Sequence, residues 1–341
     1  MRTPAALVLL LSSAAACAPA RSPVVPVDET PQAEQLSPDD APIGFRRSVV
    51  ADAWFWLRAK TLEGEAPPPF KAALAAMQEL RGELGSDASQ WEDLELPLGS
   101  ASRASELVTV YGTLPERVDV GGRFVPLRAL ALRVATAMET MEPAFRRGPY
   151  KEHEAAISRA AKELSAKLVP HEAAIARAIE ADMALPGAGR SIVITLVGDA
   201  PYPGGFAADD QGREIATFVR VRGLEGTALV ETVLTESLHA IDEVTVKAPT
   251  AMNMLRGSLA QRGLDESDPN VEMTVNAITF AEAASLVRRF VEPTHRSNGE
   301  GGFYTIFPPA PAIVAAWDRH VDGEDLQATT NAIATALGIA P

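Results

Sequence analysis

Residues 214–243 read EIATFVRVRGLEGTALVETVLTESLHAIDE, and this stretch decides the fold. Its first part, EIATFVRV (214–221), alternates apolar and polar residues as a half-exposed strand does. Between Gly226 and Val244, apolar residues recur every three or four positions, which predicts a helix with one buried side. The inward positions are Leu229, Val230, Val233, Leu234, Leu238 and Ile241. A strand followed by a helix is therefore expected here.

The segments on either side extend this pattern. SIVITLV (191–197) is a compact β-branched run, which is typical of a buried strand. Helical periodicity covers most of 45–185, with a break before His171 that Pro170 imposes. Further helices are expected at 248–262 and from Asp268, as N-cap, to Val291. The order of helices, two strands and helices predicts a predominantly helical α+β fold, with a small sheet packed on helix 226–244.

The helix carries the sequence Thr-Glu-Ser-Leu-His at positions 235–239. In a metallopeptidase helix of pattern H-E-x-x-H, two histidines one turn apart bind zinc, and the glutamate activates a zinc-bound water. Glu236 and His239 occupy two of these positions. Thr235 stands where the first ligand belongs, and Asp242 follows His239 by one turn as a supporting residue.

The order of strand, turn, TESLHAIDE helix and long helix resembles the gluzincin type of zincin metallopeptidase over residues 190–335. The resemblance implies that an edge strand, here 214–221, pairs with a peptide or protein ligand. It also implies a third zinc ligand from a later helix, here NAITFAEAASLVRRF (276–290). Ser285 falls at that ligand position, and Glu282, one turn earlier, is the nearby carboxylate. The ligand set is thus degenerate at Thr235 and at Ser285.

Two interpretations of the metal site remain open at this point. His239 could bind zinc together with Glu282 or with His295, and only then would Glu236 act as a catalytic base. Without a metal, His239 and Asp242 would be a hydrogen-bonded pair at a seam between helices. Because threonine is a poor neutral ligand and catalytic zinc takes three protein ligands, we expect no bound cofactor, with zinc as the alternative.

The N-terminus predicts export and lipidation. MRTPAALVLLLSSAAAC (1–17) has one basic residue and an apolar run too short to span a bilayer, as in a signal peptide. The small residues before Cys17 resemble a bacterial lipobox, which implies cleavage between Ala16 and Cys17 and a diacylglyceryl group on the thiol. Ala18 follows, whereas Asp at this position goes with retention at the inner membrane in enteric lipoproteins. We therefore expect a lipid-anchored protein of the bacterial cell envelope, at the outer membrane and facing the periplasm or the surface.

Composition limits the partners and sets the domain plan. The chain has 341 residues, a formal charge of −14 and one cysteine, which argues against nucleic acid and excludes a disulfide framework. Six prolines between residues 18 and 44 predict a tether after the signal peptide (1–16), covering residues 17–44. The folded part is expected to comprise a helical lobe (45–185) and a zincin-like lobe (186–341), which could form one domain.

Three functions are compatible with these features. The first is a lipoprotein whose metallopeptidase-like domain has lost catalytic zinc and binds a peptide or protein. The second is an active zinc metallohydrolase with an altered ligand set. The third is a helical scaffold protein of the envelope that is unrelated to zincins.

Overall fold

The fold was analysed in a computed structural model of the chain, which describes residues 34–36, 42–65, 67–85, 90–185, 191–200, 204–206, 214–245 and 248–339. These residues belong to one compact unit with the range 32–341. The predicted signal peptide (1–16) and the predicted lipidation site at Cys17, with Ala16 before it, lie outside the described residues. The predicted tether was too long, because Glu34–Gln35 and Ile43–Arg47 form the strands β1 and β2 of the main sheet.

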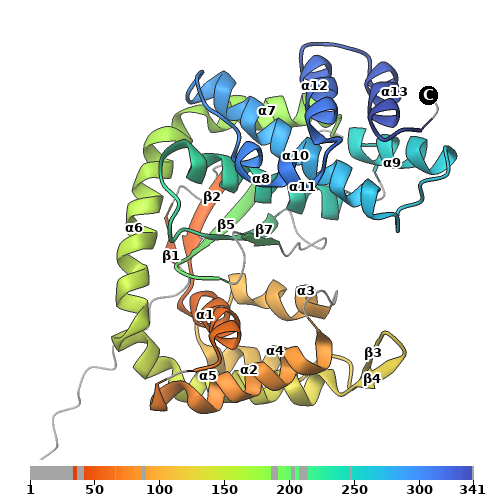
Figure 1. Cartoon of the computed structure of the whole chain (residues 1–341). Helices are drawn as coiled ribbons and strands as arrows, with labels where there is room; N and C mark the ends of the chain where they lie inside the picture. The colour runs from red at the N-terminus through yellow and green to blue at the C-terminus, as the bar shows by residue number, and fades with distance from the viewer. Residues whose placement is uncertain are drawn as a thin grey trace, which may run out of the picture. The chain divides into compact units, whose positions relative to one another are not determined.

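The sheet contains β1, β2, β5 (Ser191–Val197), β7 (Glu214–Arg220) and β6 (Gly204–Phe206) in that spatial order. Figure 1 labels the first four of these strands. β2, β5 and β7 are parallel, whereas β1 and β6 pair antiparallel at the two sides. The strands expected at 191–197 and 214–221 are thus confirmed. β2 was missed, since its pairing partner Ile192 lies 149 positions after Ile43 and leaves no local signal.

Two expectations for β7 were wrong. It is not an edge strand, because β5 pairs with it along 214–220 and β6 pairs with it along Thr217–Val219. It is also not half-exposed: Ile215 and Val219 belong to one hydrophobic cluster, and Phe218 belongs to another. Parallel strands covered on both faces are normally buried in this way. Among the described strands, β6 is the outer neighbour of β7.

The helices before β5 cover the first half of the chain. Phe45 lies in β2, so the first helix begins later than the sequence pattern predicted, at Val49, with the side chain of Ser48 accepting a hydrogen bond from the Ala51 N–H. The segment 102–113 contains a helix. These helices are α1 (Val49–Glu63), α2 (Lys71–Leu84), α3 (Gln90–Glu95), α4 (Ala104–Tyr111), α5 (Leu127–Arg147), α6 (Pro149–Lys167) and α7 (Glu172–Asp182). A hairpin of β3 (Val118–Val120) and β4 (Arg123–Val125) precedes α5.

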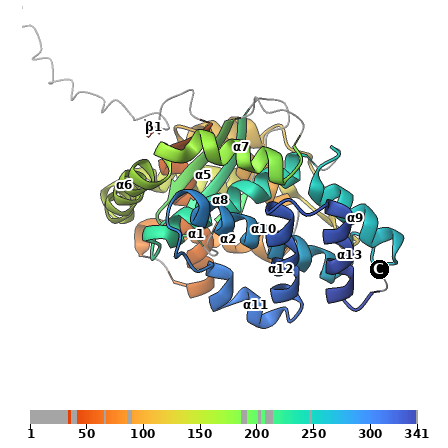
Figure 2. The same ribbon diagram turned by 90° about the horizontal axis from the view of Figure 1, so that it is seen from above.

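The helices after the sheet agree closely with the sequence pattern. They are α8 (Gly226–Val244), α9 (Ala251–Gln261), α10 (Pro269–Phe290), α11 (Phe303–Ile306), α12 (Ala310–Val321) and α13 (Leu326–Ala336). Asp268 caps α10 as expected, accepting a hydrogen bond from the Asn270 N–H. α10 packs against α8 and also against α12 (Figure 2). Within the described ranges, no helix is both long and apolar enough to cross a bilayer.

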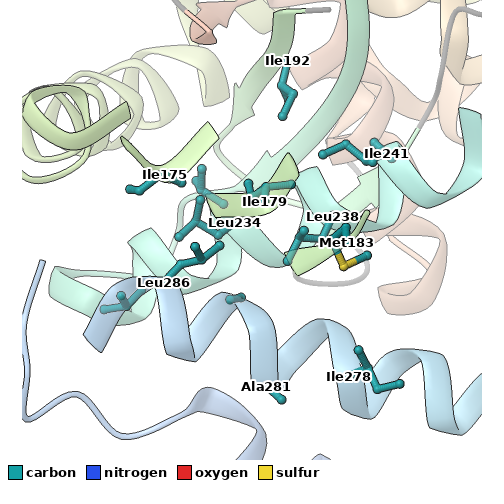
Figure 3. Close-up of a cluster of buried hydrophobic side chains, with 14 of the residues drawn as sticks. Ile175, Ile179, Met183, Ile192, Leu234, Leu238, Ile241, Ile278, Ala281 and Leu286 are labelled. Atoms are coloured by element: carbon teal, nitrogen blue, oxygen red, sulfur yellow. The ribbon is translucent and has the colours of Figure 1, made fainter. Parts of the chain in front are cut away.

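Two hydrophobic clusters fill the unit. One combines α7, α8 and α10 with the sheet, and Figure 3 shows Ile179, Leu234, Leu238 and Ile278 in it. The other combines α1 to α5 with Val197 and Phe218. The second half of α6 belongs to the first cluster, so the predicted lobe boundary at residue 185 does not separate the two cores.

Candidate functional site

The least buried side of α8 carries the candidate residues. Most of the helix is buried, but Glu236 and His239 are partly exposed and Glu243 is exposed. Positions 236, 239 and 243 lie one above the other at helical spacing, so they form one strip along α8. We call Thr235, Glu236 and His239 the α8 site, since Thr235 lies one turn before His239 on the adjoining side.

Burial sets the charge of the two titratable groups. It raises the pKa of Glu236 from 4.5 to about 7, and no charged neighbour lowers it. Burial also lowers the pKa of His239 from 6.5 to about 4, although the charge of Asp242 acts in the opposite direction. At neutral pH the imidazole is therefore uncharged, and Glu236 exists in both protonation states. Such a pair can exchange protons with a bound molecule.

The Glu236 carboxylate has no partner of its own. In the described part of the chain it makes no hydrogen bond and no ion pair. The side chain is only partly exposed, and partial loss of hydration without a protein partner disfavours the ionised carboxylate. This cost makes Glu236 an unusual residue to find on a helix that is otherwise well packed.

The Thr235 hydroxyl is also unsatisfied. Thr235 is 2% exposed, and its Oγ1 atom has no hydrogen-bond partner among the described residues. Other hydroxyls of α8 donate to the carbonyl four residues earlier, as Thr232 does to Ala228 and Ser237 to Val233. Thr235 does not take this usual partner. The α8 site thus contains one buried hydroxyl without a partner and one partly exposed carboxylate that bonds to none of the described residues.

Asp242 forms an ion pair with a residue of α9 and does not support a metal ligand. Both of its carboxylate oxygens bind the Arg256 guanidinium, with 2.8 Å between Oδ1 and Nη1. The pKa of Arg256 rises, first through this hydrogen bond. Asp242 therefore anchors the end of α8 to α9 and affects His239 through its charge.

Glu282, the carboxylate expected near the third zinc-ligand position, is bonded to a residue of α12 instead. It is fully buried in α10, and Nε1 of Trp317 donates a hydrogen bond of 2.9 Å to its Oε2 atom. Burial and the charge of Asp182 raise its pKa to about 8, so it is mainly protonated at neutral pH. A protonated carboxyl held against α12 is a poor zinc ligand.

Ser285 faces a different part of the molecule from His239. It lines a cavity of about 560 Å³ whose other walls come from α12 and the segment around α11. No residue of α8 contributes to this wall. The structure therefore does not bring Ser285 or Glu282 together with His239.

His295, the alternative ligand, belongs to a buried cluster that the sequence did not reveal. Its Nε2 atom lies 2.6 Å from Oε2 of Glu231, which is fully buried in α8. Ser297 donates a hydrogen bond of 2.8 Å to the same carboxylate, as does the backbone N–H of Asn298. These bonds fasten residues 295–298 to the first half of α8. The sequence signal that could have indicated this cluster was the position of Glu231, which lies two helical turns before His239 on the same side of α8.

A second buried polar cluster joins the two hydrophobic cores. Asp52 of α1 lies 2.7 Å from Nδ1 of His153 in α6 and accepts a hydrogen bond of 2.6 Å from the Gly198 N–H. Burial raises the pKa of Asp52, while His153 acts to lower it. Neither residue was singled out from the sequence, because nothing local indicates that positions 52 and 153 meet.

The donor set does not fit a catalytic zinc ion. Across the described residues, no three side chains of His, Cys, Asp or Glu are grouped so that they could hold a metal. The Thr235 hydroxyl, the protonated Glu282 and the engaged His295 explain this in chemical terms. Comparison with protein-family models, curated proteins and solved structures finds no match to this chain.

Proposed function

We propose that this chain is a lipid-anchored protein of the bacterial cell envelope whose zincin-like domain binds a peptide or protein without cleaving it. The strand–helix order of β7 and α8 supports the zincin-like interpretation. Three observations support the loss of catalysis: Thr235 stands at a ligand position, Glu282 is bonded to Trp317, and Ser285 lines a cavity to which α8 does not contribute. The apolar run that ends at Cys17 supports the lipid anchor.

The main observation behind the proposed ligand binding is the Glu236 carboxylate, which has no hydrogen-bond or ion-pair partner among the described residues. A group that destabilises the fold and has no internal partner is typical of a binding site, where a ligand supplies the missing bonds. A peptide offers backbone N–H groups that donate to the partly exposed Glu236 carboxylate, whereas the Thr235 hydroxyl is buried and not accessible to a ligand. Glu236 is thus suited to a ligand that presents hydrogen-bond donors.

The strand order of the sheet favours β6 over β7 as the edge to which a ligand strand could be added. Because β7 is paired on both sides over Thr217–Val219, a ligand strand cannot be added there. β6 is the neighbouring strand at that side of the sheet, and it contacts α8. We propose that an extended peptide adds to β6 by β-augmentation and lies beside the α8 site.

Equilibrium dialysis of the purified full chain against a randomised mixture of acetylated hexapeptides tests binding. We expect a subset of intact peptides to be retained by the wild type. Glu236→Leu should bind the retained peptides at least tenfold more weakly while unfolding at a higher temperature. Glu139→Gln, an exposed position in α5, is the matched control and should behave as the wild type. No retention would contradict the proposal. Zinc-dependent cleavage that requires Glu236 would establish the metallohydrolase instead.

The anchor has a separate test. Cys17→Ser should abolish acylation and leave the precursor uncleaved by the lipoprotein peptidase. Intact mass and partitioning in detergent extraction measure both effects. Wild-type protein that stays in the aqueous phase without an acyl mass would refute lipidation.

A further inference from the structure

The cavity beside Ser285 is separate from the α8 site. It has a volume of about 560 Å³ and lies between α10, α12 and the segment around α11. Cavities that hold small molecules measure about 300–1,000 Å³, so its size suits a ligand of this class. The function proposed above makes no use of it.

The two long walls of this cavity carry opposite charges. α10 contributes Arg288 and Arg289 from its last turn, whereas α12 contributes Asp318 and Asp322, one turn apart. Arg289 is engaged by Asp182, with 2.6 Å between Nη1 and Oδ2. Arg288 contacts Asp318 at 3.4 Å, and both side chains are about one-third to one-half exposed. Arg288 is therefore the more loosely paired of two equally exposed arginines, and three carboxylates line the cavity with it: Asp318, Asp322 and Glu300.

The rest of the lining combines apolar side chains with the Glu300 carboxylate and the hydroxyls of Ser285, Ser297 and Tyr304. Ala281, Ala284 and Val314 supply apolar surface from both helices. The hydroxyl of Tyr304 lies 3.4 Å from that of Ser297. Burial raises the pKa of Tyr304, so its phenol remains a neutral hydrogen-bond donor.

We propose that this cavity binds a free aliphatic α-amino acid. The carboxylate of the ligand pairs with Arg288, its ammonium group lies between Asp318 and Asp322, and its side chain covers Ala281 and Ala284. A simple anion would meet three carboxylates, those of Glu300, Asp318 and Asp322, and a simple cation would meet Arg288. A zwitterion with an apolar body satisfies both charged walls and the apolar surface together.

Calorimetric titration of the full chain with L-leucine, leucinamide and N-acetyl-L-leucine tests the charge requirement. We expect L-leucine to bind at least tenfold more tightly than either derivative, because each derivative lacks one of the two charges. Equal affinity for a derivative, or no heat with millimolar L-leucine, would overturn the proposal.

Two variants and one control locate the ligand. Arg288→Gln should weaken L-leucine at least tenfold and bring it to the level of leucinamide. Asp318→Asn should remove the preference for L-leucine over N-acetyl-L-leucine. Arg319→Gln changes an exposed arginine of α12 that pairs with Glu324 and does not line the cavity, so it should leave affinity unchanged. Circular dichroism verifies that each variant is folded, and unaltered L-leucine affinity in folded Arg288→Gln would refute the assignment.

Discussion

Glu236 and His239 lie one turn apart on α8, and burial moves their pKa values in opposite directions, to about 7 and to about 4. In the folded protein, each pKa shift favours the uncharged form of the side chain concerned. The two residues therefore affect stability in different pH ranges, and single substitutions can separate their effects.

Glu236→Gln should stabilise the protein most at alkaline pH. The folded-state pKa is above the unfolded value of 4.5, so the wild-type carboxylate is destabilising above pH 7, by about 3 kcal/mol, and harmless near pH 4.5. Urea unfolding at pH 4.5, 5.5, 6.5 and 8 should show a gain that grows with pH. Glu272→Gln, at an exposed position of α10, should show no such trend.

His239→Gln should show the opposite dependence. The folded-state pKa is below the unfolded value of 6.5, so the wild-type imidazole destabilises the fold as pH falls from 6.5 to 4. The same unfolding series should show a gain that is largest at pH 4.5 and decreases towards pH 8. If both variants changed stability equally at every pH, burial would not be the cause of their shifts.

Thr235→Val should raise the free energy of unfolding by about 1 kcal/mol. Valine has nearly the same shape, and the substitution removes a buried hydroxyl that has no partner. Thr279→Val is the matched control, because the Thr279 hydroxyl is equally buried but donates a hydrogen bond of 2.9 Å to the Val275 carbonyl. The control should be neutral or destabilised by about 1 kcal/mol. A loss of stability in Thr235→Val would mean that its hydroxyl is satisfied in solution.

Zinc affinity should rise in Thr235→His but should not rise further when Ser285→Glu is added. The wild type should hold far less than one zinc per chain, and Thr235→His should gain affinity by placing two imidazoles one turn apart. Adding Ser285→Glu should not improve it, since Ser285 faces the cavity beside α12. Zinc titration of the single and double variants measures this. Tenfold tighter binding by the double variant would place Ser285 at the third-ligand position after all.

Gly198→Ala should destabilise the protein by about 1–3 kcal/mol, because a methyl group there would overlap the His153 ring. The Asp52–His153 bond would have to shift to make room. Gly257→Ala in α9 is the control, since a methyl group at that position meets no atom within 4 Å. It should stabilise the helix by about 0.5–1 kcal/mol. Thermal unfolding distinguishes the two, and equal effects would argue against the close packing of Gly198.

The elements that could be predicted from the sequence are those with local signals. The run at 191–197 and the periodicity of 226–244 gave their elements to within a residue. β2 could not be found, because Gly44 and Phe45 acquire their strand conformation from β5 rather than from their neighbours.

Within the candidate site, sequence spacing correctly placed Thr235, Glu236 and His239 on α8, because i and i+4 positions are fixed by the helix itself. It could not place Glu282 or Ser285, since helical spacing does not say which neighbour each side of α10 meets. Trp317, the actual partner of Glu282, lies 35 positions later.

The parallel pairing of β2 with β5 also limits the order in which the chain can fold during synthesis. Arg46 and Thr195, which are hydrogen-bonded at 3.0 Å, are separated by 149 positions. The contacts among α1, α2, α4 and α5 close much shorter loops and can form first, whereas β2 must wait until β5 has been made. A chain with such non-local strand pairing is expected to fold slowly, with closure of the sheet as the late step.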